Sequence, residues 1–89
     1  MNPFRKMYMD AARAKGASHS DVLFVLQRSG YDSMTYHAFM MRLNRGTIDE
    51  SFVNTLALIV DVDAAQLFAE ASARYEFYKS RYANSDNSQ

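Results

Sequence analysis

The chain has 89 residues, 48% of them hydrophobic, which is enough for one small packed domain and leaves little length for a second. It contains no cysteine and no run of eighteen apolar residues, which excludes disulfides, cysteine-ligated metal sites and a membrane-spanning helix. Ten basic and ten acidic residues give a net charge of zero, and residues 1–16 lack the apolar core of a secretory signal, so we expect a cytoplasmic protein.

The charges are unevenly distributed along the chain. Residues 1–45 hold seven basic and three acidic residues, and residues 46–89 hold three basic and seven acidic ones. A basic half beside an acidic half suits a surface that binds a polyanion, and it equally suits a domain that associates head to tail.

The first predicted element is a helix over residues 3–15. Asn2 can cap its start, Pro3 is favourable at the first helical position, and Gly16 ends it. The apolar residues that recur at helical spacing within it are Phe4, Met7, Tyr8 and Ala11.

A second helix is predicted over residues 19–28. Ser18 or Ser20 can cap it, with Asp21 near its positive end, and Gly30 closes it. Its expected apolar face consists of Val22, Leu23, Val25 and Leu26.

A third helix follows a cap at Asp32 or Ser33 and ends at Gly46. Its apolar residues, at the spacing of one helix face, are Tyr36, Phe39, Met40 and Leu43. Leu43 lies at the centre of this stripe, so we expect it to be buried.

A fourth helix begins after a cap at Thr47 or Asp49 and breaks near Val62. Its expected buried residues are Phe52, Val53, Leu56, Ile59 and Val60, with Leu56 central.

The fifth predicted helix spans residues 63–82, with Asp63 as its cap, and residues 83–89 are expected to form a disordered tail. Aromatic residues crowd its last turns. They either pack against the first helix or form a dimer interface, for which the candidates are Tyr75, Tyr78 and Tyr82.

Two motifs then carry a family resemblance over residues 5 to about 70. Leu43-Asn44-Arg45-Gly46 ends the third helix, and Leu58-Ile59-Val60-Asp61-Val62 precedes Ala65-Gln66-Leu67-Phe68. In this order the chain resembles the lambda-repressor-like helix-turn-helix domain. The resemblance implies an all-α, five-helix domain over residues 1–82. It also implies a small, dimeric transcriptional regulator, bacterial or phage-encoded, that binds duplex DNA sequence-specifically and acts by occupying an operator.

The third helix supplies the candidate DNA-binding residues. Away from its apolar stripe it carries Thr35, His37, Ala38, Met41 and Arg42, which form either a base-reading surface or an ordinary solvated face. Arg42 is the best single candidate because arginine can donate to guanine O6 and N7 together. Arg45 is a phosphate contact or a helix-end cation, and Lys6 and Arg13 are phosphate contacts or solubilising charges.

No motif in the sequence indicates an enzyme. His19 and His37 are isolated from other ligand residues, the three glycines do not form a phosphate-binding loop, and no serine sits in a nucleophile motif. We therefore expect no metal and no cofactor. The alternative function is a protein-interaction module of the same fold, favoured by the neutral charge, the adjacent Met40 and Met41, and the aromatic C-terminal helix.

Overall fold

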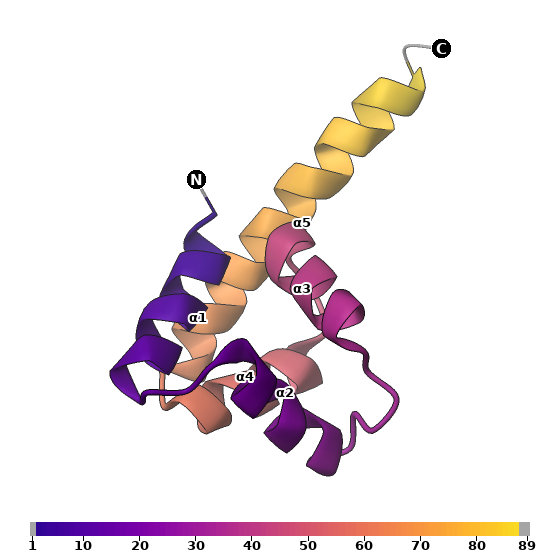
Figure 1. The fold of residues 1–89 in the computed structure, drawn as a ribbon. Coiled ribbons are helices and arrows are strands. Elements are labelled where there is room, and N and C mark those ends of the chain that lie inside the picture. Colours follow the sequence, from indigo (N-terminus) through magenta and orange to yellow (C-terminus); the bar gives the residue numbers. More distant parts are fainter. Residues whose placement is uncertain (1, 88–89) are drawn as a thin grey trace.

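A computed structural model describes the backbone of residues 2–87 and the side chains of residues 2–82 (Figure 1). The described chain is entirely helical, without a strand, as the sequence predicts. Its helices are α1 (Pro3–Ala14), α2 (His19–Arg28), α3 (Tyr36–Arg45), α4 (Glu50–Val60) and α5 (Ala64–Asn87).

Side chains of the predicted type cap four of the helices. The Asn2 side chain accepts a hydrogen bond from the Arg5 amide at the start of α1, and Ser18 forms a reciprocal capping box with Asp21 at the start of α2. The Asp49 carboxylate accepts from the Phe52 amide, and Asp63 accepts from the Gln66 amide.

The cap of α3 differs from the prediction. Neither Asp32 nor Ser33 begins the helix; Thr35 does, through a hydrogen bond of 3.0 Å from the Ala38 amide to its hydroxyl oxygen. The connection from α2 to α3 therefore occupies residues 29–35, and the Gln27 side chain crosses it by donating to the Met34 carbonyl at 2.9 Å.

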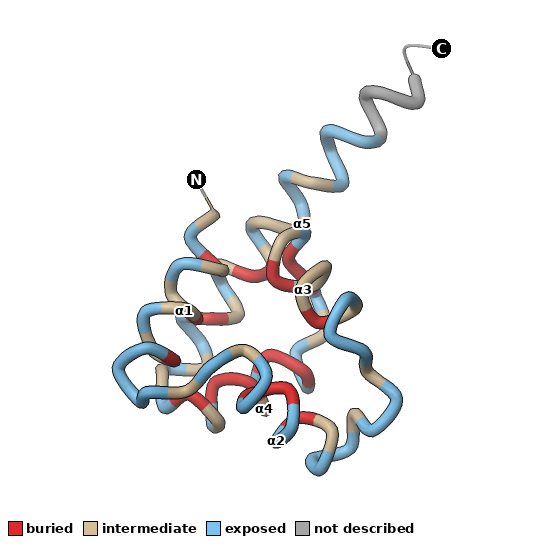
Figure 2. Tube along the Cα trace, in the orientation of Figure 1, coloured by how far each residue is buried: buried red, intermediate tan, exposed pale blue. Residues whose placement is uncertain are grey.

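The core lies where inward faces of all five helices meet (Figure 2). Leu43 and Leu56 are fully buried, as predicted. Two expected core residues were assigned wrongly, because Val25 is 42% exposed and Tyr36 is 49% exposed. The largest fully buried side chains are Phe4, Tyr8, Val22, Leu26, Phe39, Leu43, Phe52, Val53, Leu56, Val60 and Leu67.

One buried polar contact joins α1 to α2. The Tyr8 hydroxyl lies 2.9 Å from His19 Nδ1, and the two rings stack with centroids 5.6 Å apart. Tyr8 is fully covered, and this burial raises the pKa of its phenol to about 12. The hydroxyl is therefore protonated throughout the physiological range and bonds to the imidazole as a neutral group.

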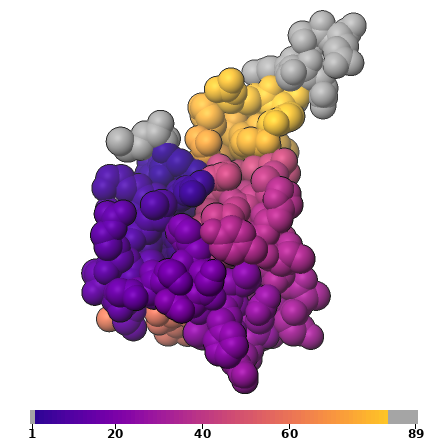
Figure 3. Space-filling view, in the orientation of Figure 1, coloured from indigo at the N-terminus to yellow at the C-terminus, as the bar shows by residue number. Residues whose placement is uncertain are grey.

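The first half of α5 packs with α1 to α4, and we call this packed part of the molecule the body; Leu67 and Ala71 are buried in it. The second half of α5 projects beyond the other helices (Figures 1 and 3). The helix continues to Asn87, so the backbone of residues 83–87 is helical where we expected a tail to begin. The rest of the expected tail, residues 88 and 89, lies outside the described residues. We call residues 74–82 the arm.

Candidate nucleic-acid interface

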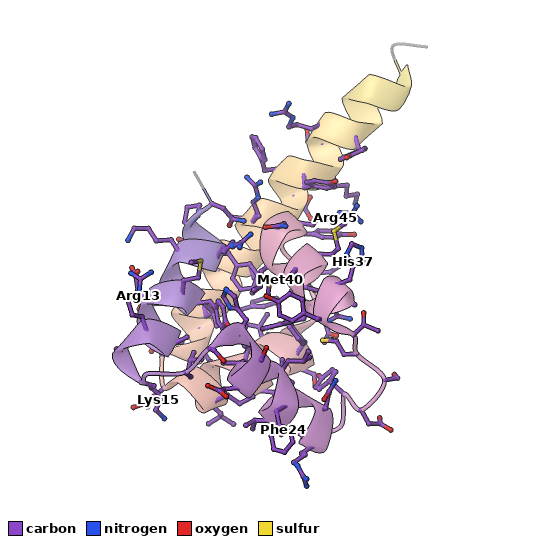
Figure 4. The ribbon with its side chains drawn as sticks, viewed as in Figure 1. Arg13, Lys15, Phe24, His37, Met40 and Arg45 are labelled. Carbon is purple, nitrogen blue, oxygen red and sulfur yellow. The ribbon has the colours of Figure 1, made fainter. Side chains whose placement is uncertain are left out.

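The candidate interface is built on α3, whose two sides differ sharply. Phe39 and Leu43 are fully buried on its inner side. His37, Met41 and Arg45 follow one another at four-residue spacing on its outer side, where His37 and Arg45 are exposed and Met41 is half-buried. Figure 4 shows His37 and Arg45 along the same edge of the helix.

The C-terminal end of α3 is fixed by side chains from α1 and α5. Asn2 donates from Nδ2 to the carbonyl oxygens of Leu43 (2.8 Å) and Asn44 (3.2 Å), and Arg74 donates from Nε to the Asn44 carbonyl at 2.9 Å. Arg5 in turn donates to the Asn44 side chain. These bonds satisfy carbonyls that a helix end leaves without intrahelical partners, and they set the orientation of α3 on the body.

Gly46 brings the end of α3 directly against α5. Its φ of 76° is open to glycine and costly for other residues, and a Cβ added there would lie 2.4 Å from the Ala71 carbonyl oxygen and from the Tyr75 amide nitrogen. The next residue, Thr47, donates its amide to the Ala71 carbonyl at 3.1 Å. The sequence indicated only that Gly46 ends the helix; the structure shows that it also permits this close approach.

Arg42, the residue expected to read a base, is engaged with the protein itself. Its Nη1 donates to Asp49 Oδ2 at 3.0 Å, and its guanidinium lies 4.6 Å from the centre of the Phe52 ring. The Asp49 carboxylate also accepts from the Phe52 amide, and this bond and then Arg42 hold the pKa of Asp49 below its usual value. Arg42 therefore ties α3 to the start of α4.

Two further candidates, at the cap and in the first turn of α3, are engaged or partly covered. The Thr35 hydroxyl caps the helix by accepting the Ala38 amide, and Ala38 is half-buried. The outer side of α3 is thus left with His37, Met41 and Arg45 from the predicted set, beside the exposed ring of Tyr36.

Lys6 and Arg13, which the sequence left open as phosphate contacts or solubilising charges, do not lie beside the outer side of α3. Arg13 and Lys15 lie at the opposite side of the molecule from His37 and Arg45 (Figure 4). Lys6 is exposed and pairs with Asp10 at 2.8 Å. The basic residue of α1 that contacts α3 is Arg5, which sequence reasoning missed because its partner, Asn44, lies 39 residues away in the chain.

Two basic residues of α5, Arg74 and Lys79, lie beside the end of α3. A groove runs between the end of α3 and the arm, and the Arg45 guanidinium lies within it, 5.3 Å from the centre of the Tyr78 ring. The lining residues are Met41, Arg42, Arg45, Gly46, Thr47, Tyr75, Tyr78 and Lys79. Lys79 was assigned no role from the sequence, although its spacing from Tyr75 and Tyr78 places the three on adjacent turns.

The three tyrosines expected at a dimer interface differ from one another in exposure. Tyr75 and Tyr78 are half-buried, both line the groove beside α3, and Tyr82 is exposed. The Tyr78 and Tyr82 rings lie close together, with centroids 4.4 Å apart. Pairing of two copies through these rings stays a prediction.

No three His, Cys, Asp or Glu side chains come together as a possible metal site within the described residues. In the same part of the chain, none of the helices combines the length and apolar character needed to cross a membrane. Comparison of the chain with protein-family models, curated proteins and solved structures gives no match.

Proposed function

We propose that the chain binds duplex DNA through the outer side of α3. The observation that carries the proposal is the setting of this helix. Its inner side is fully buried, its end is fixed by hydrogen bonds from α1 and α5, and its outer side carries His37, Met41 and Arg45 with no acidic residue among residues 36–45. A rigidly held helix of this kind fits the major groove of B-DNA.

The resemblance to the lambda-repressor-like domain supports the same proposal. On this reading α2 and α3 form the helix-turn-helix unit, with α3 as the recognition helix and residues 29–35 as an extended turn. The chain would then act as a small transcriptional regulator by occupying an operator.

We infer a role for each outer side chain from its position along α3. Residues near the start of a recognition helix reach base edges, so His37 hydrogen-bonds a base and Met41 contacts a thymine methyl group. Arg45 stands at the other end of the helix, in the groove beside the arm, where it contacts a backbone phosphate. Arg42 supports the helix through Asp49 and Phe52.

Fluorescence anisotropy with labelled 20-base-pair duplexes tests this proposal. Affinity for duplexes of random sequence should fall steeply as salt rises, because phosphate contacts release counterions. Arg45→Gln should weaken every sequence and reduce the salt slope by about 0.9, the value for one phosphate. Lys15→Gln, the same charge change on the far side of the molecule, should leave the slope unchanged.

Sequence discrimination tests the base contacts separately. His37→Ala should lower discrimination by about 1–3 kcal/mol at one base pair of a selected site and leave affinity for random duplexes nearly unchanged. Failure of the wild-type chain to bind any duplex at low salt would refute the proposal.

A protein-interaction function is the second candidate, and exposed apolar side chains away from α3 favour it. Leu58 on α4 is 82% exposed, and Phe24 and Val25 are exposed on α2. A partner that docks there should be lost on Leu58→Asp, whereas DNA binding should survive that change.

A further inference from the structure

The arm carries a face of alternating rings and guanidinium groups. Its five residues recur at spacings of three and four, which places them on one side of the helix in line with the buried Leu67 and Ala71. They line a surface groove of their own: Arg74, Phe77, Tyr78, Arg81 and Tyr82. We call these five residues the arm face.

The Phe77 ring of the arm face lies beside both guanidinium groups. Arg74 and Arg81 lie 5.3 and 5.8 Å from the centre of the Phe77 ring, which is 51% exposed. At these distances each guanidinium is attracted to the face of the ring. Its planar set of five N–H donors exceeds what the contacts within the described chain use, since only Arg74 Nε donates there, to the Asn44 carbonyl. Such a group is prepared to donate two parallel hydrogen bonds to a phosphate.

The arm face is cationic. Lys6–Asp10 and Arg42–Asp49 are the ion pairs among the described side chains, so no described carboxylate lies within pairing distance of Arg74 or Arg81. Glu76 is the one acidic residue among residues 74–82, and its position two residues from Tyr78 places it on the opposite side of the helix.

The arm face is also continuous with the surface around α3. Tyr78 belongs to the arm face and to the groove beside α3, and the Arg45 guanidinium covers its ring at 5.3 Å. A polyanion lying along the outer side of α3 therefore meets the arm face as its backbone leaves the helix.

We propose that the arm face binds backbone phosphates of nucleic acid that flank the segment contacted by α3. This inference rests on the proposed function and adds Arg74 and Arg81 as phosphate donors and Phe77 as the residue that positions them. The positive charge of the arm face favours phosphates over a second copy of the chain, because two arm faces in contact would bring like charges together.

A matched pair at the other end of the molecule provides the control. Arg28 on α2 lies over Phe24 at 4.6 Å, both residues are exposed, and Figure 4 places Phe24 far from the arm. Arg81→Gln should lower the salt slope for random 20-base-pair duplexes by about 0.9, and Arg28→Gln should leave it unchanged. Phe77→Ala should weaken binding about two- to five-fold at constant slope, because the charges remain but their positioning is lost. Phe24→Ala should have no such effect.

The outcomes separate this inference from the proposed function. If Arg81→Gln binds like the wild type while Arg45→Gln is weakened, α3 binds DNA and the arm face does not. If Arg81→Gln lowers the slope and His37→Ala changes no sequence preference, the arm face binds phosphates and the role of α3 fails.

Equal slope changes in Arg81→Gln and Arg28→Gln would show a general charge effect and overturn the inference. A change from dimer to monomer in Phe77→Ala, seen by sedimentation at unchanged slope, would assign the face to a second copy and also overturn it.

Discussion

Arg42 and Arg45 stand three residues apart on α3 and differ in what surrounds them. Arg42 is held by Asp49 and Phe52, whereas Arg45 is exposed above Tyr78. We expect Arg42→Ala to lower the free energy of unfolding by about 1–2 kcal/mol, since a half-exposed ion pair and a cation–π contact are lost together. Arg45→Ala should change it by less than about 0.5 kcal/mol. Urea denaturation of the two variants measures the difference, and equal losses would contradict this assignment.

Asp49 makes the free energy of unfolding depend on pH. Hydrogen bonds from Phe52, and the neighbouring Arg42, lower the pKa of its carboxyl in the folded state. A lowered pKa means that its contribution is present above the ordinary value of 3.8 and is lost as the pH falls through the folded-state value. Asp49→Ala should cost about 1 kcal/mol at pH 7, as for loss of a helix cap, and the gap to the wild type should shrink in acid. A gap that is constant from pH 7 to pH 2 would argue against this role.

Gly46 and Gly16 provide a comparison at similar φ, with Gly46 also at an extended ψ of −177°. Both have positive φ, at 76° and 70°, but a Cβ at Gly46 would collide with α5 and a Cβ at Gly16 would meet nothing within 4 Å. Gly16→Ala should cost about 1–2 kcal/mol of backbone strain. Gly46→Ala should cost about 2–5 kcal/mol, because overpacking adds to that strain. Thermal unfolding of both variants tests whether the contact between the end of α3 and α5 is as tight as described.

At the scale of the helices, α4 has a buried side and an exposed side, and two of its leucines, two residues apart, lie on opposite sides. Leu56 is fully buried and Leu58 is 82% exposed. Leu56→Ala should lower the free energy of unfolding by about 2–5 kcal/mol, since it leaves a cavity in the core. Leu58→Ala, the same chemical change on the same helix, should alter it by less than about 0.5 kcal/mol. Similar losses at the two positions would mean that the inward face of α4 is wrongly assigned.

The sequence predicted where the helices lie more reliably than which of their residues are buried. Caps and stop glycines are local signals, and they located α2 to the residue and the other helix starts to within a residue or two, apart from α3. The start of α3 was misjudged because three residues near it, Asp32, Ser33 and Thr35, can all cap a helix. Tyr36 fits the apolar stripe by spacing, but it stands in the first turn, beyond the edge of the core.

The candidate site was less predictable because it depends on how helices meet. Helical spacing placed Arg42 outside the apolar stripe, and nothing local showed that Asp49, seven residues later, would return to pair with it. Arg5, Arg74 and Lys79 reach the end of α3 only through tertiary packing. The excess of basic residues in residues 1–45 suggested one basic face, yet Arg13 and Lys15 lie across the molecule from α3.

At the scale of the whole molecule, α3 and the arm form one continuous surface, joined at Tyr78. In the proposed function, the outer side of α3 would supply base contacts, and the arm would add phosphate contacts that carry no sequence information. The described chain extends over 44 Å along its longest axis, against 26 and 19 Å across it. The basic surface is therefore local, since the chain as a whole carries no net charge.

Amide chemical-shift mapping on addition of a 12-base-pair duplex at low salt tests the central claim most directly, because it reports the bound surface residue by residue. We expect the largest changes at residues 36–45 of α3 and 74–82 of the arm, with little change at Phe24 on α2 and Leu58 on α4. Changes centred on α2 and α4, or no change at any duplex concentration, would contradict it.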